Sequence, residues 1–159
     1  MAVRQEARVR RWESTLQALW IGVGLQVVSI LLPLLDLWFF GSVESHVEGA
    51  YPEWDQNEVA LERNAIVIGL VIVGVLGLAG WLVAIWAAKR DRAVRATVTT
   101  LFALGMSTLT ATAGMGGEAY DQIVPLWLGI TLLVIAALPG VTAVLSVWFR
   151  EHDEQRPTT

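Results

Sequence analysis

The chain has 159 residues, of which 55% are hydrophobic and 16% are charged, and its formal net charge at pH 7 is −4. Soluble domains carry about 25% charged residues, so this composition argues against a soluble domain, and we expect no nucleic-acid partner. The absence of cysteine excludes disulfide exchange, structural disulfides and thiolate metal sites.

Four uncharged stretches are each long enough to cross a hydrocarbon layer about 30 Å thick at a helical rise of about 1.5 Å per residue. We therefore predict an all-α membrane protein, with residues 1–159 as a single four-span membrane domain. The predicted transmembrane helices are 15–40, 61–88, 94–115 and 122–149. Short connections favour an up-down-up-down antiparallel bundle, with an acidic outer loop at 41–60 and a solvated C-terminal tail at 150–159.

Charge is distributed unequally between the two sides of this predicted bundle. Ten of the eleven basic residues fall in the two tails and the second connection, whereas acidic residues gather in the first and third connections. The positive-inside rule then predicts a multi-pass protein of the cell (plasma) membrane with both termini in the cytoplasm. Tryptophans near the span ends indicate an aromatic belt at the headgroups: Trp12, Trp20, Trp38, Trp54, Trp86, Trp127 and Trp148.

The first predicted span has one face that differs from the rest of the helix. Gly22, Gln26, Ser29, Pro33 and Asp36 recur at alternating spacings of four and three, so they share one side. An unpaired amide in hydrocarbon costs several kcal/mol. We therefore predict that Gln26 bonds to another helix and that this face contacts protein. Asp36 is interpreted as a carboxylate near the membrane surface, with an ion or proton site as the alternative.

The first connection contains the segment WDQNEV, which reads as a helix start. Asp55 is predicted as the N-cap, Glu58 completes a capping box, and Trp54 and Val59 have the spacing of a hydrophobic staple. The second helix should therefore begin near Gln56 and extend beyond the hydrocarbon layer at its outer end.

Few ionisable groups are available for chemistry inside the spans. Arg63 is the only basic residue on the outer side, so we predict that it lies close to Asp36. His46 and His152 lie outside all four spans, which excludes a haem held by two histidines within the bundle. We expect no catalytic residue, no metal site and no cofactor.

The third predicted span carries a seam of small and weakly polar residues. They recur at spacings of four and three, like a heptad seam, while leucines lie on the opposite side. Small residues mark helix contacts in membranes, so we predict a central helix with at least two neighbours. The alternative is a polar permeation stripe. The seam consists of Ala96, Thr100, Ala103, Ser107, Thr110 and Gly114.

These features favour a non-enzymatic membrane protein that acts through helix packing, as an accessory subunit or small scaffold. Its partners would be the lipid bilayer and either another membrane protein or a second copy. The main alternative is an oligomeric channel or carrier for a cation or small solute, lined by the polar faces of the first and third spans. The candidate polar or packing residues are Gly22, Gln26, Ser29, Asp36, Arg63, Thr100, Ser107 and Thr110.

The sequence supports two further classes of protein less well. An intramembrane enzyme needs an activated nucleophile, and the spans hold serine and threonine but no histidine or lysine to activate them. A lipid- or small-molecule-binding sensor could use a cleft beside the first and fourth spans, where Pro33 and Pro139 are expected to kink the helices.

The segment AAKRDRAVRATVTTLFALG combines small residues, a basic turn and a Thr- and Leu-rich span. In this respect the chain resembles small four-span membrane proteins of high-GC bacteria. The resemblance covers this segment and the hydropathy pattern, and it implies no particular activity.

Overall fold

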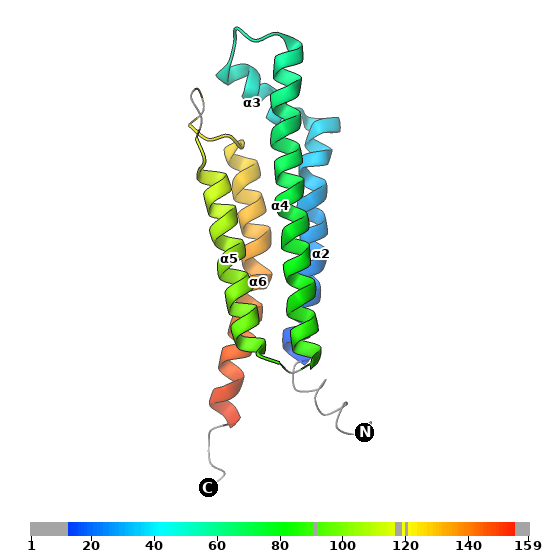
Figure 1. Ribbon diagram of the computed structural model, residues 1–159, viewed down its shortest axis with the longest axis vertical. Coiled ribbons are helices and arrows are strands. Elements are labelled where there is room, and N and C mark those ends of the chain that lie inside the picture. The colour runs from blue at the N-terminus through cyan, green and yellow to red at the C-terminus, as the bar shows by residue number, and fades with distance from the viewer. Residues whose placement is uncertain (1–12, 91, 117–118, 120, 155–159) are drawn as a thin grey trace.

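The computed structural model describes residues 13–90, 92–116, 119 and 121–154, and the regular structure in these residues is entirely helical (Figure 1). The elements are α2 (Glu13–Leu35), the π-helical turn η1 (Asp36–Phe40), α3 (Ser42–Ala50), α4 (Gln56–Arg90), α5 (Val94–Gly114) and α6 (Leu126–Glu154). The segments long and apolar enough to cross a bilayer are Glu13–Phe40, Gln56–Arg90, Val94–Gly114 and Leu126–Phe149. They fall on the four stretches predicted from the sequence, so the described residues form an all-helical fold with four candidate membrane spans, as a membrane protein would.

The four long helices lie side by side (Figure 1). α2 makes the most extensive contacts, against α4 and α6, whereas α5 packs less extensively against the same two helices. The short α3 lies on α4 at the end of the bundle that also carries the α5–α6 connection. We call this end the α3 end. The start of α2 and the α4–α5 connection lie at the opposite end.

Two clusters of buried apolar side chains hold the bundle together, one toward each end. The cluster at the α3 end contains Val43, Val47, Val59, Ile66, Leu70, Val124, Leu128 and Leu132. The cluster toward the opposite end contains Leu19, Ala84, Ile85, Ala88, Val94, Val98, Ala143 and Val147. Between the two clusters, near the middle of the long helices, packing depends on small residues and one buried amide.

The sequence predicts a loop over residues 41–60, but the structure forms the nine-residue helix α3 within it. Val43 and Val47, four residues apart, are fully buried, and this contact anchors α3 to the bundle. Two apolar residues in an otherwise polar segment give a weak periodic signal. The helix therefore depends on tertiary burial, which the sequence pattern did not reveal.

The start of α4 agrees with the prediction. Asp55 Oδ1 accepts hydrogen bonds from the backbone N–H groups of Asn57 (2.7 Å) and Glu58 (3.0 Å), and Glu58 Oε2 accepts one from the Asp55 N–H (3.0 Å). This reciprocal pair is a capping box. The predicted staple residues, Trp54 and Val59, pack in the same apolar cluster.

A π-helical turn reverses the chain from α2 into α3. Pro33, in the last turns of α2, has no N–H to donate to the carbonyl of Ser29. Gly41 closes the turn with a φ of +61° and donates its N–H to the carbonyl of Asp36 (2.7 Å). This left-handed conformation favours glycine, because a Cβ would be strained there. The turn brings the side chain of Asp36 to the first residues of α3.

Candidate functional site

The candidate residues lie in three separate places. Gly22, Gln26, Ser29, Pro33 and Asp36, here called the α2 face, are all buried. The seam of the third span, here called the α5 face, lies on the exposed surface of the bundle. Arg63 stands on α4 at the α3 end. The α2 face and the α5 face do not form one continuous polar path.

Gln26 joins α2 to α4 near the middle of both helices. Its Nε2 donates to the carbonyl oxygen of Gly74 (3.0 Å), and its Oε1 accepts from the indole N–H of Trp81 (3.2 Å). Gln26 is only 8% exposed, so these bonds give both the nitrogen and the oxygen of its amide a partner where hydrocarbon offers none. The predicted bond from Gln26 to another helix is present.

The other residues of the α2 face allow close packing. An added Cβ on Gly22 would lie 2.5–2.7 Å from ring atoms of Trp81, and one on Gly74 would lie 2.6 Å from Cγ1 of Ile30. Helices therefore approach closely at these glycines, as is common in membranes. Ser29 is also satisfied locally, because its hydroxyl donates to the carbonyl of Leu25 in its own helix (3.1 Å).

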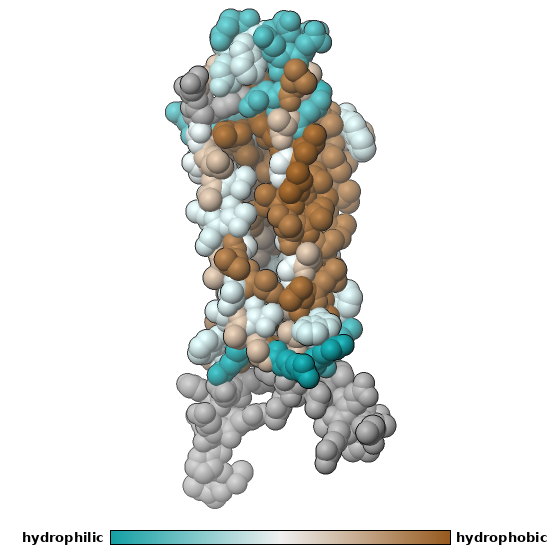
Figure 2. All heavy atoms as spheres, in the orientation of Figure 1, coloured by the Kyte–Doolittle hydropathy of each residue, from teal (hydrophilic) through white to brown (hydrophobic). Residues whose placement is uncertain are grey.

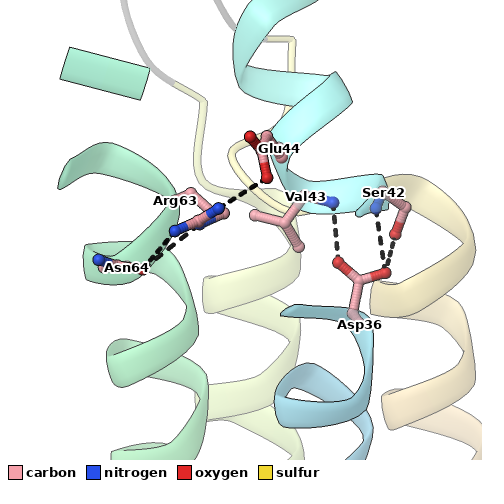
Figure 3. A network of polar contacts seen from close by, with 6 residues as sticks. All are labelled: Asp36, Ser42, Val43, Glu44, Arg63 and Asn64. Atoms are coloured by element: carbon pink, nitrogen blue, oxygen red, sulfur yellow. Dashed lines mark hydrogen bonds and ion pairs between the residues drawn. The ribbon is translucent and has the colours of Figure 1, made fainter. Parts of the chain in front are cut away.

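Asp36 caps α3. Its carboxylate, only 1% exposed, accepts hydrogen bonds from the backbone N–H groups of Ser42 (3.2 Å) and Val43 (2.9 Å), and from the Ser42 hydroxyl (Figure 3). Figure 3 shows the carboxylate directly against the first residues of α3. The first N–H groups of a helix lack acceptors within the helix, so this acid performs the role of a capping residue supplied from the preceding turn.

Asp36 and Arg63, which the sequence predicts to lie close together, do not form an ion pair with each other, and each side chain has its own partner. The Arg63 guanidinium pairs with Glu44 of α3 (2.6 Å) and donates to Asn64 (3.2 and 3.3 Å; Figure 3). Arg63 and Glu44 are 20% and 42% exposed. Both acids therefore hold α3 in place. Asp36 caps the start of α3, and Glu44, which lies on α3, pairs with Arg63 of α4. The sequence interpretation missed this arrangement because it did not include α3.

The prediction that α5 is a central helix is wrong. It contacts two neighbours, α4 and α6, but only 6% of its apolar segment is buried, compared with 22–33% for the other spans. Its buried residues are Val94 and Val98, near its start. All members of the α5 face are exposed: Ala96, Thr100, Ala103, Ser107, Thr110 and Gly114. The seam therefore has no packing partner within the described chain.

Two polar contacts were not anticipated from the sequence. Thr15 is fully buried and its hydroxyl lies 2.8 Å from that of Ser146 in α6. Since the Ser146 hydroxyl donates to the carbonyl of Ala143 (2.7 Å), Thr15 is the donor to Ser146. The spacing of Thr15 from Leu19 continues the pattern of the α2 face and could have identified it. His46 lies 2.7 Å from the carbonyl of Gln122 and ties α3 to the α5–α6 connection.

No protein family, curated protein or solved structure matches this chain. Among the residues that the structure describes, no group of three or more His, Asp or Glu side chains could hold a metal ion. The class that the described residues define is an all-helical fold with four candidate membrane spans, an arrangement shared by many unrelated functions.

Proposed function

We propose that this protein is a non-enzymatic accessory subunit of the cell membrane that binds a transmembrane helix of another membrane protein through the α5 face. In this proposal the four long helices form an up-down-up-down bundle with both termini in the cytoplasm. The distribution of basic residues along the sequence supports that orientation, because ten of eleven fall in the two tails and the second connection.

The observation that carries the proposal is the mismatch between the polarity of α5 and its exposure. α5 has the lowest hydropathy of the four spans and also the smallest buried fraction. In Figure 2 the surface over α5 is paler, and therefore less hydrophobic, than the brown surface over α4. If the protein acted alone in lipid, we would expect its least apolar span to be the most protected. A partner that covers the α5 face removes this mismatch.

The hydroxyl groups of the α5 face support the same conclusion. Thr108 and Thr112, also on α5, donate to carbonyls of their own helix (2.9 Å each). Among the described residues, the hydroxyls of Thr100, Ser107 and Thr110 have no such acceptor. A hydrogen bond between transmembrane helices contributes on average about 0.6 kcal/mol and up to about 2 kcal/mol, so three available hydroxyls and several small residues favour a helix partner.

The charge at the start of α5 favours a different protein over a second copy. Two copies of the same topology would pair their α5 helices in parallel, which brings Arg92 and Arg95 of each copy close to those of the other. Juxtaposed like charges across an interface are unfavourable. A partner helix with acidic groups at that end would be attracted instead.

The main alternative, an oligomeric channel or carrier, requires the polar faces of α2 and α5 to line one path. The α2 face is buried, with Gln26 bonded to α4 and Asp36 bonded to α3. The α5 face points away from it, outside the bundle. This separation disfavours the channel proposal.

The test compares two substitutions on α5. Ser107→Leu places a large apolar side chain on the α5 face, whereas Thr108→Leu changes an exposed residue whose hydroxyl is already satisfied. Both variants present an apolar group to lipid, so both should fold. A photo-crosslinking residue at Thr110, with one at Leu76 of α4 as control, identifies any helix on the α5 face.

We expect crosslinks to one membrane protein of different mass from position 110 but not from position 76. Ser107→Leu should abolish that complex in native mass spectrometry after mild extraction, and Thr108→Leu should keep it. A clean monomer, a complex of identical chains only, or a complex equally retained in both variants would overturn the proposal.

A further inference from the structure

A cavity of about 240 Å³ adjoins the apolar cluster at the end opposite α3, whose residues Leu19, Ala84, Val98 and Ala143 line it, and all four long helices contribute to its wall. Its lining contains no charged residue, and much of it is small: Gly77, Gly80, Gly105, Ala136 and Gly140. At Gly80 and Gly105 there is open space where a side chain would stand, since an added Cβ would meet only Leu101 at 3.9 Å at Gly80 and nothing within 4 Å at Gly105. The cavity does not belong to the α5 face and is independent of the proposed partner helix.

The cavity opens sideways between α4 and α5. Leu76 of α4 and Leu104 of α5 line it and are 65% and 60% exposed. Both residues lie well inside their candidate spans, Gln56–Arg90 and Val94–Gly114. A molecule would therefore enter this cavity from the hydrocarbon layer and not from water.

Gln26 provides a polar group in the wall of this apolar space. Its amide is 8% exposed and its Nε2 carries two hydrogens. One hydrogen is donated to the carbonyl of Gly74, and among the described residues the second has no acceptor. A buried donor without an acceptor is costly, and water is scarce at this depth. An oxygen atom on a molecule inside the cavity would satisfy it.

The size of the cavity limits the ligand. An apolar cavity of about 150 Å³ accommodates benzene, which has six non-hydrogen atoms. In proportion, this cavity accommodates about ten. We propose that it binds an uncharged, mainly apolar molecule dissolved in the membrane, which inserts about ten non-hydrogen atoms between α4 and α5 and presents an oxygen acceptor to Gln26.

Two probes of nearly equal size test both parts of this proposal. Decan-2-one and n-undecane have the same number of non-hydrogen atoms, but only the ketone has an oxygen acceptor. The indole N–H signal of Trp81, which lines the cavity, reports binding in nitrogen-15 NMR spectra of the full chain in nanodiscs. Its assignment comes from the signal that disappears in Trp81→Phe.

Matched glycine variants on α4 and α5 separate cavity binding from partition into lipid. Gly80→Leu fills the cavity, since a Cβ there would meet only Cδ2 of Leu101 at 3.9 Å. Gly105→Leu fills it from α5, where nothing lies within 4 Å of an added Cβ. Gly69→Leu, also with open space around its Cβ and outside the cavity lining, is the control.

We expect a saturable shift of the Trp81 signal with decan-2-one. The affinity for n-undecane should be about threefold to tenfold weaker, because the alkane lacks one neutral hydrogen bond. Gly80→Leu and Gly105→Leu should abolish saturation, and Gly69→Leu should keep it. Gln26→Leu should bind the two probes equally. A shift that does not saturate in the wild type, that persists in both filling variants, or that is equal for the two probes in the wild type would overturn the proposal.

Discussion

Replacing Asp36 by alanine should selectively destabilise the α3 end of the protein. The carboxylate accepts two backbone N–H bonds and one hydroxyl bond while only 1% exposed. A hydrogen bond to a charged group contributes about 1.5–3 kcal/mol, and loss of an N-cap costs about 0.5–2 kcal/mol. These two contributions overlap because the cap consists of the same bonds. We therefore expect Asp36→Ala to cost about 2–4 kcal/mol.

The assay is amide hydrogen exchange of α3 with the protein in nanodiscs. Since about 1.4 kcal/mol corresponds to tenfold in an equilibrium constant, protection of the Val43 and Val47 amides should fall by about 30-fold to 700-fold, or to the unprotected rate. Amides in the middle of α4 should be unchanged, because Asp36 makes no contact there among the hydrogen bonds described. Asp36→Asn keeps one acceptor oxygen and should fall between wild type and Asp36→Ala.

Glu48→Ala is the matched control, because Glu48 is an exposed acid on α3 with no bonded partner among the described residues. It should change α3 exchange very little. If Asp36→Ala exchanges like Glu48→Ala, the carboxylate does not cap α3 and its burial needs another explanation. If the whole bundle loses protection equally, the loss is global and the local role assigned to Asp36 is wrong.

Three further outcomes follow from the packing and capping. Gly22→Ala should lower the thermal unfolding midpoint and cost about 1–3 kcal/mol of stability, because the added Cβ would overlap the indole ring of Trp81. Gly24→Ala is the control: nothing lies within 4 Å of its added Cβ, so this variant should be neutral or slightly stabilising. Asp55→Ala should cost about 0.5–2 kcal/mol and increase exchange only in the first turn of α4, while an asparagine there should be nearly neutral. Glu44 and Arg63 are both partly exposed, so a double-mutant cycle on this ion pair should give a coupling free energy below about 1 kcal/mol that weakens with salt. A larger coupling free energy that does not depend on salt would contradict this.

The features predicted correctly are those that follow from the chemistry of a single residue or of one continuous segment. Four spans follow from the length of uncharged stretches, because hydrocarbon cannot satisfy charges. The capping box at Asp55 depends on side chains three residues apart, and the bond from Gln26 to a neighbour follows from the cost of an unpaired amide in lipid. In each case one residue and its surroundings were enough.

The features that were missed depend on contacts between distant segments. α3 exists because Val43 and Val47 find a buried site on residues far along the chain. Because α3 is present, Arg63 and Asp36 both have partners on it: Arg63 pairs with Glu44, and Asp36 caps the first turn of the helix. A prediction that lacked α3 gave no reason to choose Glu44, one of several acids of the first connection, over Asp36 as the partner of Arg63.

The α2 and α5 faces show most clearly what a sequence pattern can determine. Both have small or polar residues at spacings of four and three, and the same argument predicts that each contacts protein. The structure buries one face against α4 and α6 and leaves the other exposed. The pattern thus predicts that a face needs a neighbour, but it cannot say whether that neighbour belongs to the same chain. The cost of exposing polar groups to lipid applies equally to both faces, so under the proposed function the unburied face is where the partner helix would contribute most to stability.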